Sequence, residues 1–249
     1  MTIKKHKNTK NLLIVVAMLV VLVIGTIGAY FTATDEVTNN FTVGNISVEL
    51  NEPSWEALDD LNENGIPDVA EDVLPNTLIE KDPTVTNLSD SSDAFVFLKV
   101  TVPKASVLTS DVASGNKNAE AAVTQLFQMN DSSNTTAGRG VAWNGKDTYN
   151  STSWYLVSST TTGVDANEYI YVYGKSNACT ALPAGETTAA PLFNSVTFCN
   201  AVEGQGLEDK DLEIKIDAYA IQTKDLTADD VVAPADVWSI LNAQTKTAA

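Results

Sequence analysis

The stretch Phe95-Val96-Phe97-Leu98-Lys99-Val100-Thr101-Val102 decides the fold class of this chain of 249 residues. It is rich in β-branched and aromatic residues, which favour β-strands. Other stretches share this composition or alternate polar and apolar residues, as a strand with one solvated face does. They are residues 45–50, 154–157, 169–173 and 212–217, the last of which runs on to Ile221.

Helical spacing is sparse by comparison. Residues 119–129 place Ala122, Leu126 and Met129 on one side and predict a helix. A second short helix is predicted at 228–230 or 234–238. Many short strands between turn signals indicate a mainly β chain with one or two short helices, arranged as a β-sandwich or jelly roll. A single domain over residues 30–249 is expected, preceded by an N-terminal signal helix.

The N-terminal 29 residues have the layout of a secretory signal peptide. Four lysines lie in the first ten residues, Leu12–Ile24 is entirely apolar, and small residues follow up to Ala29. We expect cleavage between Ala29 and Tyr30, with a cut after Gly28 as the close alternative. An uncleaved membrane anchor is the other alternative. Counted through Ala29, the stretch from Leu12 has 18 residues, which approaches the about 20 residues that a spanning helix needs.

Charge and histidine content exclude several functions. The full chain has 15 basic and 32 acidic residues, and removing the signal peptide takes away four lysines, so the net charge becomes −21. Such an acidic chain is not expected to bind nucleic acid. The signal peptide also contains the only histidine, His6, so the exported chain lacks a histidine-based triad or zinc site. We therefore expect no enzyme, although a hydrolase using paired carboxylates such as Asp229 and Asp230 stays open.

Two further features bear on stability and binding. Cys179 and Cys199 are 20 positions apart in an exported chain, which predicts a disulfide; two free buried thiols are the alternative. Tyr169, Tyr171 and Tyr173 share one face of a strand. They form either a binding ladder or, more commonly, packing between sheets.

Residues 60–71 fit a twelve-residue calcium loop. Calcium requires six to eight hard oxygen ligands, and alternate residues of a tight loop point inward; Gly65 allows the sharp turn. Because two of the first three ligands are asparagines, weak binding is expected. The alternative is a polar Asn-Gly turn without a cation. The expected ligands are Asp60, Asn62, Asn64, the Ile66 carbonyl, Asp68 and Glu71.

Several short motifs together resemble the TasA/camelysin-like family of exported proteins, which depend on the signal peptidase SipW. The motifs are Gly25–Asp35 running on to Phe41–Ile46, Lys81–Asn87 before the central strand, Leu182–Thr188 before Pro191–Val196, and Leu212–Gln222. The resemblance implies a jelly roll and a role at the cell surface or in the biofilm matrix. The camelysin-like metallopeptidase activity is not expected, because the exported chain has no histidine.

The resemblance also implies a mode of assembly. TasA-like members polymerise into fibres by donating an N-terminal strand to the next subunit, a form of strand addition. Here the donor would lie within residues 30–50, with Phe31, Val37, Phe41, Val43, Ile46 and Val48 as its assembly residues. The implied partners are other copies of the chain and the signal peptidase, without stable membrane association after cleavage. The alternative is a monomeric, calcium-stabilised surface binding module or adhesin.

Overall fold

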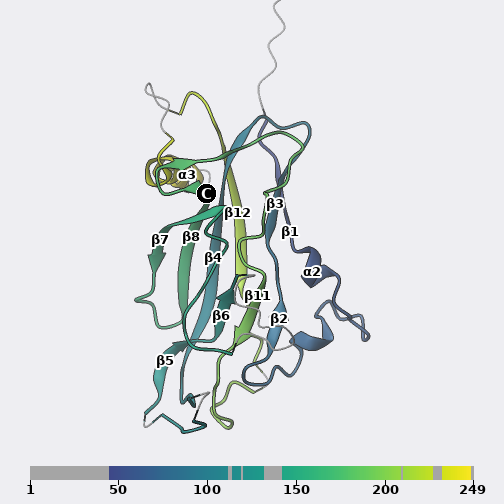
Figure 1. Cartoon of the computed structure of the whole chain (residues 1–249), viewed down its shortest axis with the longest axis vertical. Helices are drawn as coiled ribbons and strands as arrows, with labels where there is room; N and C mark the ends of the chain where they lie inside the picture. The colour runs from purple at the N-terminus through teal and green to yellow at the C-terminus, as the bar shows by residue number, and fades with distance from the viewer. Residues whose placement is uncertain are drawn as a thin grey trace, which may run out of the picture. The chain divides into compact units, whose positions relative to one another are not determined.

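Strand β4 (Ala94–Val107) is the longest strand and organises the fold (Figure 1). In the computed structural model, β4 extends the predicted strand at 95–102 in both directions. Phe95 and Phe97 are buried on one face of β4, and the alternate residues Val96, Leu98, Val100 and Val102 are buried on the other. The structure describes residues 45–111, 114–118, 120–131, 142–208, 210–226 and 232–247, all within one compact unit, Gly44–Ala249.

A seven-stranded antiparallel sheet surrounds β4. The strand β8 (Ala166–Lys175) pairs with one side of β4, and β12 (Lys215–Gln222) pairs with the other. The edge strand β7 (Trp154–Thr160) pairs with β8, with a bulge between Leu156 and Ser158. The sheet is completed by three short strands, β5 (Ala122–Gln125), β9 (Ala178–Cys179) and β10 (Ala181–Leu182).

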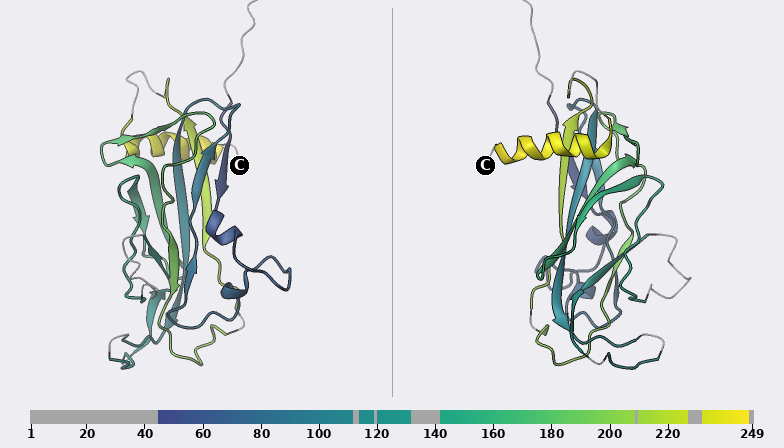
Figure 2. Two further views of the ribbon diagram at one scale, coloured as in Figure 1. Left: turned by 45° about the vertical axis from the view of Figure 1, so that its right-hand side comes forward. Right: turned by 90° about the vertical axis from the view of Figure 1, so that its left-hand side faces the viewer.

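Two smaller antiparallel sheets pack against this one. The three-stranded sheet contains β2 (Leu78–Glu80), β11 (Ser195–Phe198) and β6 (Phe127–Asn130), in that order. The third sheet pairs β1 (Val48–Asn51) with β3 (Thr84–Asn87). The main core lies between these sheets, and one sheet curls into a half-barrel (Figure 2). The predicted mainly β class is therefore confirmed.

Helix α3 (Pro234–Thr247) covers part of the other face of the large sheet. It begins at a proline, which suits the first helical turn, and Asp236 lies in that turn, where a negative charge is favourable. Its buried residues Val237 and Leu241 belong to the same core cluster as Phe97. The helix predicted near 234–238 is thus present, and α2 (Pro53–Glu56) is a single turn.

The predicted helix at 119–129 is wrong, because this segment forms strands β5 and β6. Val123 pairs with Ser106 of β4, and Phe127 pairs with Phe198 of β11. Backbone hydrogen bonds to two neighbouring strands outweigh the weak helical spacing of the apolar residues, since local propensity yields to tertiary context. Within the described residues, no helix is long and apolar enough to cross a membrane.

Candidate functional site

The predicted calcium loop folds around Asp60. The Asp60 carboxylate accepts hydrogen bonds from the backbone N–H groups of Asn64 (3.2 Å) and Gly65 (2.8 Å). Gly65 has a φ of 85°, in the left-handed region that glycine adopts without steric cost, so the sharp turn expected at loop position 6 is present. The chain then reverses into the short 3₁₀ helix η1 (Asp68–Ala70).

The far end of the loop folds back onto its beginning. The Glu71 carboxylate accepts hydrogen bonds from the side-chain amides of Asn62 (3.0 Å) and Asn64 (2.5 Å). Asp68 Oδ1 accepts one from the Leu61 N–H (3.1 Å), and the Ile66 N–H donates to Asn64 Oδ1 (2.8 Å). Five predicted ligand side chains are therefore tied into one exposed loop.

This arrangement can be tested for its fit to a cation. The amide N–H₂ groups of Asn62 and Asn64 point at Glu71, and rotation of each amide by half a turn would present its oxygen instead. Within the described parts of the chain, no three His, Cys, Asp or Glu side chains are gathered closely enough to hold a metal. Calcium binding would therefore depend on the asparagine and carbonyl oxygens, and it stays a prediction.

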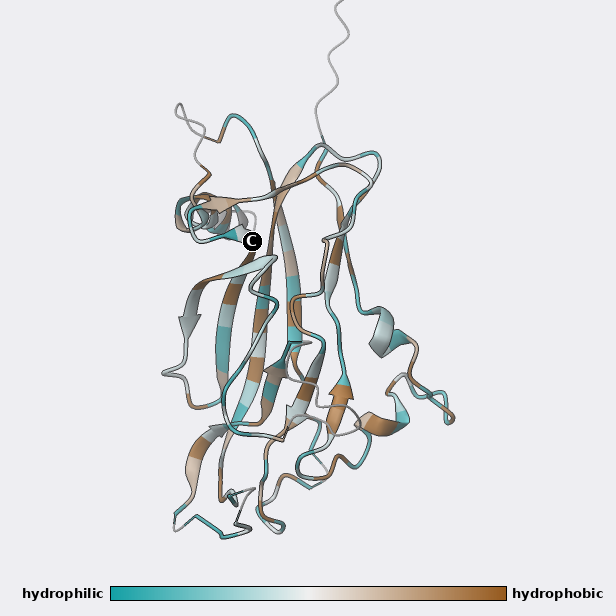
Figure 3. Ribbon diagram, viewed as in Figure 1, coloured by the Kyte–Doolittle hydropathy of each residue, from teal (hydrophilic) through white to brown (hydrophobic). Residues whose placement is uncertain are grey.

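A groove of about 940 Å³ lies beside this loop. Its apolar lining comes from β2, β6, β11 and the segment 201–214 that precedes β12, and Figure 3 shows β2 as a hydrophobic strand. Leu61, Ile66, Val69 and Leu74, all in the neighbouring stretch 61–74, are exposed large apolar residues; Leu61 is 83% exposed and Leu74 69%. Ile66 and Leu74 also line the groove, and exposed apolar side chains gathered at a groove are typical of an interaction site.

One sheet edge borders the groove. Among the described residues, β2, which contributes Ile79 to the groove lining, pairs only with β11. The other side of β2 therefore carries backbone N–H and C=O groups without a ladder partner, which is the arrangement that accepts an added strand.

Lys81, which directly follows β2, lines the groove as a buried cation. Its Nζ donates to Glu52 Oε2 at 2.6 Å and lies 4.6 Å from the centre of the Trp55 ring. Its side chain is only 10% exposed. Sequence reasoning missed this residue, because nothing in the local pattern distinguishes Lys81 from a solvated lysine.

The predicted disulfide between Cys179 and Cys199 is absent, and both thiols are free and buried. Cys199 belongs to the core between the sheets, whereas Cys179 belongs to the cluster beneath α3. The large sheet separates these clusters, so the pair cannot bond in this fold. Burial raises the pKa of Cys179 to about 12 and that of Cys199 to about 11, which keeps both thiols protonated and unreactive.

The tyrosine stripe belongs mainly to the core. Tyr169 and Tyr171 are buried, and Tyr171 lies against Tyr149 with ring centroids 4.9 Å apart. Tyr173 is half-buried and its ring meets Trp154 edge-on at 5.6 Å. Packing is therefore the correct interpretation, and an exposed binding ladder is excluded.

The predicted assembly strand is only partly described. Ile46 and Val48 are half-buried, and Val48 pairs with Asn87 of β3. The other assembly residues, Phe31, Val37, Phe41 and Val43, and the expected cleavage site at Ala29 and Tyr30, lie outside the described residues. Comparison of the chain with family models, curated proteins and solved structures finds no match.

Proposed function

We propose that this chain is an exported structural protein of the cell surface or biofilm matrix that assembles into filaments. In this proposal residues 30–50 of one copy add a strand to the groove of the next copy. The observation that carries the proposal is the groove itself, which combines an apolar floor with the open edge of β2. A head-to-tail contact that does not close into a ring propagates into a filament.

Only part of residues 30–50 can be donated to a neighbouring copy. Val48, Glu49 and Leu50 pair with β3 in their own subunit, so residues 30–44 are the part available to a neighbour. We further propose that the sheets form a jelly roll that the donated strand completes, and that calcium bound at residues 60–71 holds the groove wall. Ile66, Ala70 and Glu71 belong both to this region and to the groove lining, which supports that link.

Deleting residues Tyr30–Asn40 from the exported chain tests the donor strand. We expect filaments in electron micrographs of the parent protein and none from the truncated one, because the groove would lose its occupant. A control chain with these eleven residues scrambled keeps length and composition while disrupting the apolar alternation. Filaments of unchanged length from the truncated chain would contradict the proposal.

The acceptor groove is tested by Leu207→Glu, which places a charge on a half-buried groove residue. Val123→Glu makes the same change on β5 at an already exposed side chain and is the matched control. Loss of filaments in the first variant alone supports the groove as the acceptor. A parent protein that stays monomeric in sedimentation at high concentration would instead favour the monomeric binding module, which would then bind through an acidic loop because Tyr169 and Tyr171 are buried.

A further inference from the structure

We propose that residues 57–75 form a lid that closes over the groove and so controls access to it. The structure describes the open form of this lid, in which the groove is accessible. Closing would regulate the filament function proposed above, and this consequence rests on that function. The lid itself is a property of the single chain and can be tested without filaments.

The lid is anchored by hydrogen bonds at its two ends. Just before it, the Ser54 N–H and hydroxyl donate to the two carboxylate oxygens of Asp82, at 2.8 Å and 2.7 Å. Just after it, Asn76 donates its N–H to the Phe198 carbonyl at 3.2 Å and its side-chain amide to Asn200 Oδ1 at 2.6 Å. A rotation of the lid about the line between these anchors would leave both ends in place.

Between the anchors, no hydrogen bond ties the lid to the rest of the described chain. Every hydrogen bond that residues 57–75 make within that chain has its partner in residues 53–77, including the network around Asp60. The lid therefore holds together as a unit. Its contacts with the core come from three partly buried apolar residues, Leu58, Ala70 and Val73. Because closing breaks no hydrogen bond to the described body, it meets little resistance.

The lid also carries an apolar surface that closing would bury. Four of the seven exposed large apolar residues in the described chain lie within it. Figure 2 shows the part between α2 and η1 projecting away from the sheets. The groove beside it has an apolar floor that includes Ile79 and Phe198. Folding the lid onto this floor removes apolar area of both from water, which is favourable.

The backbone near the second anchor provides a hinge. Asp72 has a φ of 47° and Asn76 a φ of 63°, both in the left-handed region that side chains other than glycine seldom adopt. Asn76 is anchored, whereas Asp72 is exposed and lies at the end of the internal network of the lid. A change of φ at Asp72 towards the extended or helical region would swing the lid. Such element-terminal residues are typical hinges, and a strained backbone of this kind is typical of moving segments.

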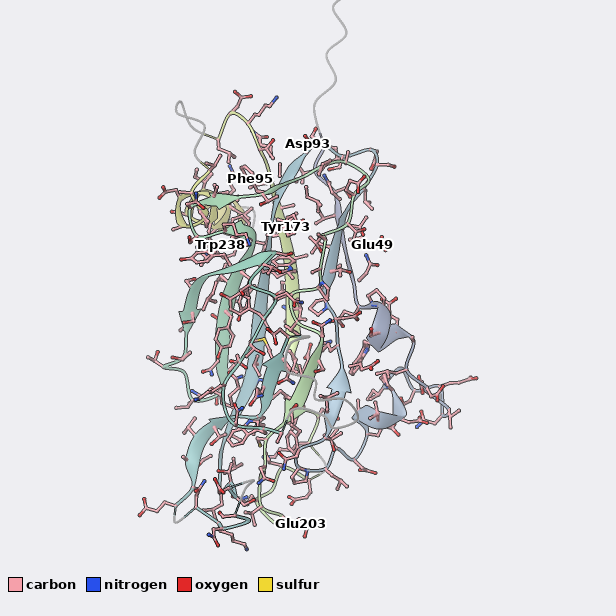
Figure 4. All side chains as sticks on the ribbon, viewed as in Figure 1. Glu49, Asp93, Phe95, Tyr173, Glu203 and Trp238 are labelled. Carbon is pink, nitrogen blue, oxygen red and sulfur yellow. The ribbon has the colours of Figure 1, made fainter. Side chains whose placement is uncertain are left out.

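Electron–electron double resonance between two spin labels tests the lid. One label is placed on the lid with Glu63→Cys and the other on the groove wall with Glu203→Cys, which is exposed at one end of the described unit (Figure 4). The native thiols are buried and will not take the label. We expect two distances, for the open and closed forms. A pair without the lid, Val123→Cys/Glu203→Cys, should give one distance.

A variant that weakens closing makes the test specific. Leu61 and Val69 are exposed on the lid and do not line the open groove. Leu61→Ser/Val69→Ser should therefore lower the ratio of closed to open forms at least about tenfold. Val164→Ser removes an exposed apolar side chain outside the lid and should leave the ratio within about twofold. A single distance from the lid pair in the parent chain would overturn the lid but not the filament function.

Filament growth then tests the regulation. Leu61→Ser/Val69→Ser leaves the lining of the open groove unchanged, so seeded filaments should elongate faster by the factor by which the open fraction rises. Val164→Ser should match the parent chain. Equal elongation rates despite a changed ratio of forms would overturn the regulation. Two distances in a chain that forms no filaments would support the lid and contradict the filament function.

Discussion

At the scale of single residues, the polar network around Asp147 is the least expected feature of the core. The Asp147 carboxylate accepts hydrogen bonds from the Met129 N–H and the Gln125 side-chain amide, each at 2.9 Å. Gln125 in turn accepts one from the Tyr169 hydroxyl at 2.7 Å. Burial nevertheless raises the pKa of Asp147 above its ordinary value, because desolvation outweighs these hydrogen bonds.

This shift predicts how stability depends on pH. The folded state binds the Asp147 proton more tightly than the unfolded state does. Protonation of Asp147 therefore stabilises the fold fully below the pKa of the unfolded state, near 3.9, and this stabilisation is lost as pH rises through the pKa of the folded state. Asp147→Asn removes this loss. The free energy of unfolding of Asp147→Asn should therefore rise relative to that of the parent protein as pH rises from about 4 to 7.

Urea denaturation at several pH values measures this difference. Asp90→Asn, which removes an exposed carboxylate, is the reference for the slope. A difference in free energy of unfolding between Asp147→Asn and the parent protein that does not change with pH would show that burial does not raise the pKa of Asp147.

Single residues also show where sequence reasoning stops. The β-branched and aromatic residues at 95–102 correctly predicted a strand there, because β-forming composition is a local property of the sequence. The roles of Lys81, Asp147 and the two cysteines depend on partners that lie far away in sequence; Asp147, for example, contacts Gln125 from 22 positions away. No local pattern contains that information, and the disulfide prediction failed for the same reason.

At the scale of elements, strands that carry strong β-forming residues were predictable and marginal segments were not. The strands predicted at 154–157 and 169–173 lie within β7 and β8. Residues 119–129 were misassigned because their apolar spacing suits a helix, whereas the sheet edges available beside them favour strands. Short strands such as β2 and β9 carry too few residues to show a period, and only pairing with neighbours defines them.

Helix α3 is expected to contribute to stability through its buried face. Trp238 contacts Phe97 with ring centroids 5.4 Å apart, and Leu241 is 5% exposed in the same cluster. Leu241→Ala should lower the free energy of unfolding by about 2–4 kcal/mol, because it leaves a cavity against the sheet.

Ser239→Ala, on the exposed side of α3, should change the same quantity by less than about 0.5 kcal/mol. Urea denaturation of both variants provides the comparison. Similar effects of the two substitutions would mean that α3 does not pack on the sheet as described.

At the scale of the whole molecule, the proposed binding of calcium to residues 60–71 would link binding to folding. A ligand that binds only the folded state raises the melting temperature. If calcium binds with a dissociation constant of about 10⁻⁴–10⁻³ M, then roughly 10 mM calcium should stabilise the chain by about 1–3 kcal/mol. The effect should disappear on addition of a chelator.

Calorimetric melting with and without calcium measures this stabilisation. Glu71→Gln removes the carboxylate that closes the loop and should abolish the calcium-dependent shift. Glu49→Gln, an exposed carboxylate on β1, controls for the general effect of losing one charge and should leave the shift intact. A calcium-dependent shift that survives in Glu71→Gln would place the cation elsewhere.

The bulge in β7 has a consequence for how copies of this chain can associate. β7 is the outer strand of the large sheet, and its register slips between Leu156 and Ser158. A slipped, twisted border strand offers a poor template for another chain, and hydroxyl side chains occupy its last positions, Ser158–Thr160. Lateral growth into amyloid-like ribbons is thereby discouraged at this border, so the proposed filament would grow through the groove and not through β7.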